Sequence, residues 1–189
     1  MSEKTFVEEF QEAYDKSNGE WLELENGPIE SPGVTGEMLR WFERNLNDDL
    51  YRKWCPGPHR SYKSLVFPDI QGEVIEESCA PYEACIMLVR HPPIEETVFA
   101  NDLRVPRNRA NYMEVFDLKN RILFKILHEF YIYPDKVVLY NRYRVPKALS
   151  ASALKAFMDH QEEEYFFNKF LPKAFSEKTW MVKEECVLD

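Results

Sequence analysis

The segment of residues 152–171 most constrains the fold, because its apolar residues recur with the period of one long helix. At about 100° per residue, one side of this helix is apolar and the other is charged. The apolar side carries Ala153, Phe157, Phe167 and Leu171, and the opposite side carries Lys155, Asp159, Glu162 and Lys169. Such a helix must bury its apolar side against another element of the fold.

His160 and Glu164 lie on the apolar side of this helix. They are four residues apart in the sequence, so their side chains lie one turn apart on the same face. An ionised carboxylate in a protein core needs a cation, a hydrogen-bond donor or a proton. The pair is therefore a candidate for holding a divalent metal ion from one side.

The rest of the chain predicts two short helices and a set of antiparallel strands. A helix over 6–14 precedes a turn-rich surface segment over 18–33, and Thr35 caps a second helix. Pro134 and Asp135 mark a hairpin turn between two long strands. The strands are expected over 62–67, 73–77, 84–90, 112–116, 121–133 and 136–145, and Ser150 or Ser152 caps the long helix. This order predicts an α+β fold, with a curved sheet wrapped on the C-terminal helix around a cavity for a small ligand.

The composition restricts the partners. With 189 residues we expect a single domain over 1–189. A net charge of −9 without a basic run argues against nucleic acid and anionic membrane surfaces as partners. No apolar stretch is long enough to span a bilayer, and the first residues do not read as a signal peptide. Four cysteines without CxxC spacing favour reduced thiols, so a cytoplasmic location is expected. The sequence leaves open whether the protein forms a homodimer.

The chain has four histidines, and three of them lie far from the helical pair in sequence. Taken singly, His59, His91 and His128 are most simply satisfied or exposed histidines. Zinc sites, however, often combine two ligands close in sequence with one or two distant ones. A site of three or four such ligands with an open position can activate a water molecule or polarise a carbonyl group.

Several motifs, in a shared order, resemble those of the diacetylphloroglucinol hydrolase and phloretin hydrolase family. The first is Tyr51-x-x-Trp54-x-Pro56-x-x-His59. The others are the Met-Leu and Trp-Phe helix over 33–42, the strand Val74-Ile75-Glu76, the segment Asn141-Arg142-Tyr143-Arg144 after His128, and His160-x-x-x-Glu164 followed by Leu171-Pro172. The match covers roughly residues 33–175, which leaves an N-terminal arm over 1–32 and a tail over 176–189.

The resemblance implies a helix-grip fold, related to the plant pollen allergens, and a Zn²⁺ ion. It further implies an enzyme that cleaves a carbon–carbon bond between an acyl group and a phenolic or polyketide-type ring. Carried over by residue, the zinc ligands would be His59, Glu76, His160 and Glu164. His128 would be the acid/base residue, and Tyr51 and Tyr143 would hydrogen-bond the substrate oxygens.

The chain departs from the family pattern at several positions. Cys55 stands where the family often has a histidine, Tyr62 where it has a substrate-contacting asparagine, and Asn45 where it has a tyrosine. Glu73 and Glu77 compete with Glu76 for the metal.

These departures keep other functions open. The same metal pocket could serve a cyclase, an isomerase or a retro-aldol enzyme of secondary metabolism. A non-catalytic protein that binds small ligands would need no metal. Cys55 beside His59 could also act as a thiol nucleophile or as an extra ligand.

Overall fold

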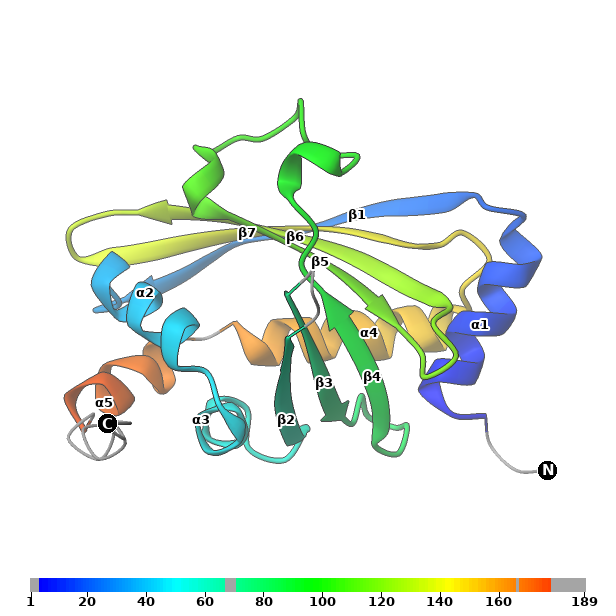
Figure 1. Ribbon diagram of the computed structural model, residues 1–189, viewed down its shortest axis with the longest axis horizontal. Coiled ribbons are helices and arrows are strands. Elements are labelled where there is room, and N and C mark those ends of the chain that lie inside the picture. The colour runs from blue at the N-terminus through cyan, green and yellow to red at the C-terminus, as the bar shows by residue number, and fades with distance from the viewer. Residues whose placement is uncertain (1–3, 67–70, 166, 178–189) are drawn as a thin grey trace, which may run out of the picture.

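The computed structural model describes residues 4–66, 71–165 and 167–177. Its centre is a seven-stranded antiparallel sheet in the order β1-β7-β6-β5-β4-β3-β2 (Figure 1). The strands are β1 (Trp21–Pro32), β2 (His59–Val66), β3 (Gln71–Glu77), β4 (Cys85–Arg90), β5 (Ala110–Phe116), β6 (Ile122–Ile132) and β7 (Lys136–Pro146). The helices are α1 (Phe6–Ser17), α2 (Gly36–Asn45), α3 (Asp48–Trp54), α4 (Ala151–Glu164) and α5 (Leu171–Ser176), and short 3₁₀ turns are η1 (Ile94–Glu96), η2 (Arg107–Arg109) and η3 (Phe167–Lys169).

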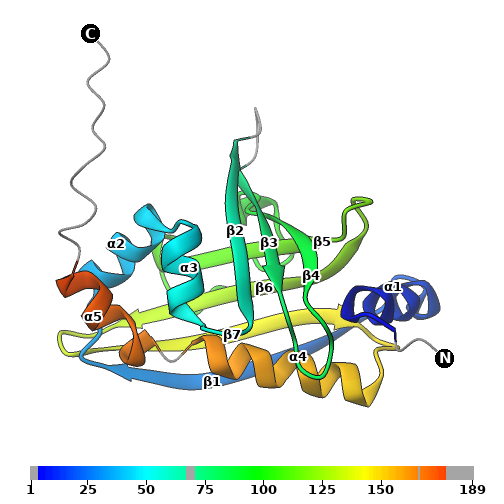
Figure 2. The ribbon, with the colours of Figure 1, turned by 90° about the horizontal axis from the view of Figure 1, so that it is seen from below.

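The sheet curves around α4, which lies along its inner face (Figures 1 and 2). In Figure 2, β2, β3 and β4 stand steeply to the long strands β1 and β7. Phe157 of α4 packs in the main core with Phe10 of α1 and Phe124 of β6. The predicted α+β helix-grip fold is therefore confirmed.

The hairpin of β6 and β7 has the turn that the sequence predicts. Ile132 pairs with Val137, and Tyr133 N donates to Lys136 O at 2.9 Å. The two-residue turn sets the register of the whole hairpin, in which His128 pairs with Asn141. Because side chains alternate between the faces of a sheet, both of these residues share one face.

The segment predicted as a turn-rich surface loop is instead strand β1, an edge strand that pairs with β7. A register shift between Asn26 and Ile29 lets the strand continue past its glycine and proline. A side chain at Gly27 would meet Leu139 O at 2.8 Å, and the backbone there has φ +132°, so glycine suits this position. Together with α1, which contributes Phe10 to the core, β1 makes the predicted N-terminal arm an integral part of the fold.

The long C-terminal helix is shorter than predicted. Ser150 caps it by accepting a hydrogen bond from Ala153 N at 3.2 Å, and the helix ends at Glu164. Residues 167–176 form η3 and α5 instead of continuing it. Tyr165 follows directly after the helix, and this position becomes important for the cavity. Residues 178–189 of the predicted tail lie outside the described residues.

The connection from β4 to β5 crosses the outer face of the sheet, opposite α4 (Figure 1). It is anchored by Glu129, which accepts from Arg104 N at 2.6 Å and lies 3.2 Å from Arg142 Nε. Among the described residues, no helix combines the length and the apolar character needed to cross a membrane.

Candidate metal centre and cavity

Four buried side chains meet between α4 and the sheet: His59, Glu77, His160 and Glu164. One nitrogen or oxygen atom from each lies within 4.8 Å of those of the others. His59 Nε2 lies 2.7 Å from Glu164 Oε1, and His160 Nε2 lies 3.2 Å from the same oxygen. Glu77 Oε2 lies 3.3 Å from His160 Nε2. The structure thus brings together three of the four residues predicted as zinc ligands.

Glu77, and not Glu76, is the fourth member of this cluster. Side chains alternate along β3, so Ile75 and Glu77 are buried, whereas Glu76 is half-buried and accepts a hydrogen bond from Ser61 Oγ at 3.2 Å. The prediction of Glu76 is corrected to Glu77, which the sequence had left as a competitor.

The loop after α3 delivers His59 to the cluster. Gly57, with φ +108°, makes the turn that leads into β2, and His59 N donates to Cys55 O at 3.1 Å. Trp54 of α3 donates from Nε1 to the backbone oxygen of Glu164 at 2.5 Å. This hydrogen bond ties α3 to the end of α4, so the distant parts of the site are fixed to each other.

Neighbouring groups orient the four side chains. His59 Nδ1 lies 3.0 Å from Tyr51 O, so it donates to that carbonyl and presents Nε2 to the cluster. Gln161 Nε2 donates to Glu164 Oε2 at 3.1 Å. The Tyr51 hydroxyl donates to Glu77 Oε1, and the Tyr51 ring stacks on His59 with a centroid distance of 3.9 Å. Predicted as a substrate contact, Tyr51 therefore also supports the cluster.

The charges of the cluster are strongly linked. Burial raises the pKa of Glu164, but His160 and His59 lower it more, so the carboxyl has a pKa below its ordinary value. Burial lowers the pKa of His160, and the Glu164 charge overcomes this and holds that pKa well above its ordinary value. In the absence of a metal, the Glu164 carboxylate and the two histidines therefore stabilise one another's charges.

The donor set fits a divalent ion such as Zn²⁺. Two imidazole Nε2 atoms and two carboxylate oxygens are the ligand types that zinc takes in four-coordinate sites. The backbone acceptor at His59 Nδ1 is the outer contact that metal-binding histidines usually have.

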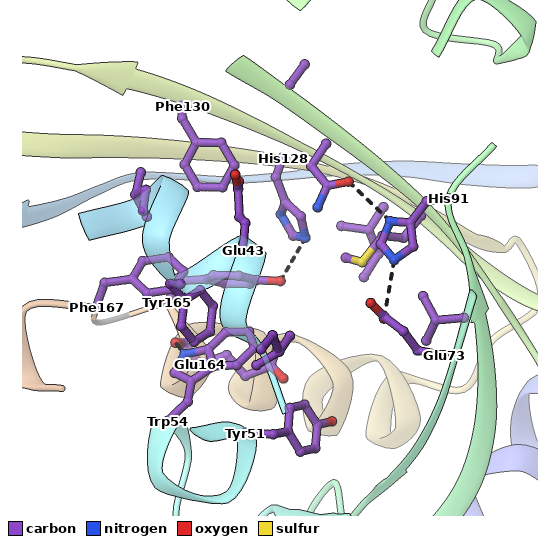
Figure 3. Close-up of a pocket in the computed structure, with 18 of the residues that line it drawn as sticks. Glu43, Tyr51, Trp54, Glu73, His91, His128, Phe130, Glu164, Tyr165 and Phe167 are labelled. Atoms are coloured by element: carbon purple, nitrogen blue, oxygen red, sulfur yellow. Dashed lines mark hydrogen bonds and ion pairs between the residues drawn. The ribbon is translucent and has the colours of Figure 1, made fainter. Parts of the chain in front are cut away.

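A cavity of about 570 Å³ adjoins the cluster, and Tyr51, Glu77 and Glu164 belong to its wall. His128 faces the same cavity from β6 (Figure 3). Its Nδ1 lies 2.7 Å from Asn141 Oδ1, and the Tyr165 hydroxyl lies 2.9 Å from its Nε2. Burial lowers the pKa of His128 to about 4, so the ring is neutral near neutral pH. Nδ1 then donates to Asn141, and Nε2 accepts from Tyr165.

Tyr143 does not reach the cavity. It is not one of the described residues that line the cavity. Its ring is fully buried and packs against Phe157, with a centroid distance of 5.2 Å. The predicted contact of Tyr143 with substrate oxygens is thus corrected to a packing role in the core.

Cys55 is buried beside His59 but is poorly suited to nucleophilic chemistry. Burial, together with the nearby Glu164 charge, raises the pKa of its thiol to about 12. The reactive form of a cysteine is the thiolate, which is scarce at neutral pH when the pKa is this high.

Sequence reasoning missed Asn111 and Tyr165, which line the cavity, and Asn141, which holds His128 from behind. A signal for Asn141 was present, since the turn at Pro134 and Asp135 places it opposite His128. Tyr165 could have been considered as the residue directly after Glu164, four positions from Gln161, which also lines the cavity.

Comparison with known proteins shows similarity of fold alone. No known protein-family model and no curated protein matches the sequence. The Zhui aromatase/cyclase from Streptomyces sp. R1128 is similar over 84% of this chain and 96% of its own, with a TM-score of 0.53 and 8% identity. The di-domain aromatase/cyclase StfQ from the steffimycin biosynthetic pathway is similar over 87% of this chain, with a TM-score of 0.52 and 9% identity. This chain spans 55% of the length of StfQ.

Proposed function

We propose that this protein is a metal-dependent enzyme that hydrolyses the carbon–carbon bond between an acyl group and a phenolic or polyketide-type ring. The observation that carries the proposal is the cluster of His59, Glu77, His160 and Glu164 beside a cavity that His128 also lines. A volume of about 570 Å³ suits a ring with several substituents. When bound by these four residues, a divalent ion such as Zn²⁺ would supply Lewis-acid polarisation of a carbonyl group or activation of water.

The residues of the chain account for the proton transfers that hydrolysis needs. Water adds OH to the acyl carbon, the bond to the ring breaks, and the ring carbon takes the proton. His128 is neutral and held in one tautomer by Asn141, so its Nε2 can accept the proton of water and return it to the ring. The Tyr165 hydroxyl is hydrogen-bonded to Nε2 of His128, so it relays the proton between the water molecule and that nitrogen.

The proposal also accounts for the binding of the ring. Apolar side chains from the sheet, including Val89, Met113 and Ile126, line the cavity and exclude water from the ring. Tyr51 holds Glu77 through its hydroxyl, which fixes one carboxylate of the cluster at the cavity wall.

Metal analysis of the purified protein is the first test. We expect about one zinc per chain under metal-replete conditions. The zinc should be lost in both His160→Ala and Glu164→Ala, because both residues belong to the same metal site. Absence of a stoichiometric metal would overturn the enzyme proposal in favour of a protein that only binds small ligands.

A second candidate reaction is cyclisation, isomerisation or retro-aldol cleavage of a polyketide-type substrate in the same pocket. The fold shared with Zhui and StfQ, which are aromatase/cyclases, favours it. Incubation with acylphloroglucinols and with linear polyketide mimics in H₂¹⁸O separates the two reactions. Hydrolysis places ¹⁸O in the released carboxylic acid. A product without that label, formed by dehydration or rearrangement, would replace hydrolysis with the second candidate.

A further inference from the structure

Tyr62 of β2, Glu73 of β3, His91 just after β4 and Asn111 of β5 form one chain of polar contacts in the cavity wall. Tyr62 of β2 donates from its hydroxyl to Glu73 Oε1 at 3.0 Å. Glu73 Oε2 lies 3.2 Å from Nε2 of His91, just after β4. His91 Nδ1 lies 3.2 Å from Oδ1 of Asn111 in β5. All four residues line the cavity, and Figure 3 shows the pair of His91 and Glu73 apart from Tyr165 and Glu164.

This chain fixes the orientation of the Asn111 amide. The Glu73 carboxylate accepts and has no hydrogen to donate, so the proton between the two side chains belongs to His91 Nε2. Burial lowers the pKa of His91, but the contact with Glu73 raises it more, and the net shift is upward. The Asn111 oxygen, not its nitrogen, faces His91 Nδ1, and because an amide oxygen can only accept, Nδ1 donates to it. The NH₂ group of Asn111 is then left over.

That NH₂ group faces the cavity without a partner. Asn111 makes one side-chain hydrogen bond among the described residues, through its oxygen, and Nδ2 is not among the fully buried unpaired atoms. Asn111 also pairs directly with His128 in the register of β5 and β6. The apolar side chains around it, such as Met113 and Ile126, offer no acceptor. A polar donor in such surroundings is best satisfied by a ligand.

We infer that Asn111 is a ligand-contacting residue whose NH₂ group donates a hydrogen bond to a hydroxyl, carbonyl or phenolate oxygen of a ring in the cavity, beside His128. Tyr62, Glu73 and His91 are positioning residues that hold the amide in this orientation. The inference rests on the proposed function only in that an oxygenated ring enters the cavity, and it requires neither the metal nor turnover.

Two probes of equal symmetry test the inference. Phloroglucinol (1,3,5-trihydroxybenzene) carries ring oxygens but has no acyl group to hydrolyse, and 1,3,5-trimethylbenzene replaces each oxygen with a methyl group. Affinity is measured by calorimetry for the wild type, Asn111→Ala and the control Asn108→Ala, whose asparagine lines the cavity but is exposed and outside the hydrogen-bonded chain.

Asn111→Ala is expected to weaken phloroglucinol binding by about tenfold or more, since one buried hydrogen bond is lost. Binding of trimethylbenzene should change little, and Asn108→Ala should leave both affinities near those of the wild type. Equal losses for the two probes in Asn111→Ala would indicate a change of cavity shape and overturn the inference, as would unchanged phloroglucinol binding.

The positioning role has its own readout. The side-chain ¹⁵N–¹H₂ resonances of Asn111, identified by their loss in Asn111→Asp, should shift on adding phloroglucinol and not on adding trimethylbenzene. Tyr62→Phe removes one hydroxyl and should reduce the ratio of the two affinities without altering trimethylbenzene binding. Unshifted amide resonances would refute the contact. Because phloroglucinol cannot be cleaved, failure of the hydrolysis proposal leaves this result unaffected.

Discussion

His128 and His91 face one cavity, yet their contributions to stability should depend on pH with opposite signs. The pKa of His128 is lowered by burial to about 4, from an ordinary value of 6.5. Its stabilising contribution is fully present above the unfolded pKa and is lost as the pH falls toward the folded pKa, because only the unfolded state takes up the proton. The pKa of His91 is raised by Glu73, so its contribution is full below 6.5 and is lost as the pH rises through the folded pKa.

The magnitude for His128 follows from the two pKa values. Between about pH 7 and about pH 5, the unfolded state gains most of its proton and the folded state gains little, which costs about 2 kcal/mol. The change is measured as the free energy of unfolding of the wild type minus that of His128→Gln. We expect this difference to fall by about 2 kcal/mol on acidification over this range. For His91→Gln, the same difference should grow as the pH falls.

Urea unfolding, followed by tryptophan fluorescence, gives both differences at a series of pH values. The variants share every other titrating group with the wild type, so the comparison cancels the general effect of acid. A difference for His128→Gln that stays level or grows on acidification would refute the assignment of a neutral, buried His128. The Cε1–H resonance of His128 provides an independent check, since it should not titrate above about pH 5.

Three further predictions concern the site itself. Glu77→Gln should lower the zinc content and Glu76→Gln should not, as measured by metal analysis of protein purified in parallel; equal loss in both would contradict the assignment of Glu77. Tyr165→Phe removes the proton relay to His128 and should reduce kcat by about tenfold or more while zinc stays bound; an unchanged kcat would exclude the relay. Cys55→Ser should retain most of the turnover; a loss of turnover in this variant at full zinc content would show that the thiol takes part in the reaction.

The elements of the fold could be predicted from the sequence wherever the local turn and helix-cap residues favoured the same structure as the tertiary packing. The strands β6 and β7, rich in β-branched and aromatic residues, flank the predicted turn at Pro134 and Asp135, and Thr35 and Ser150 cap helices as expected. Strand β1 could not be found this way, because glycine and proline within it are signals for turns. It is a strand because its partner β7 offers free hydrogen-bonding groups and its position at the edge tolerates proline.

In the metal cluster, local sequence predicts the two helix residues but not which glutamate of β3 joins them. The spacing of His160 and Glu164 fixes their shared face in any helix, and the structure places both in the cluster. In β3, Val74 and Ile75 are both apolar, so the alternation that separates the buried face from the other cannot be read from sequence. Only the pairing of β3 with its neighbours decides that Glu77 faces α4 and that Glu76 does not.

Tyr165 shows where a helix boundary drawn from periodicity fails. It lies four residues after Gln161, on the cavity side of the helix, but α4 ends at Glu164 and not at residue 171. The end of a helix without a glycine is set by what the following residues pack against, here Phe167 on Trp54, with a centroid distance of 5.7 Å. The same α3 residue also binds the Glu164 carbonyl, which an α-helix leaves without a partner at its end. The helix therefore ends where α3 packs against it, and Tyr165, directly after that end, contacts His128 of the distant strand β6.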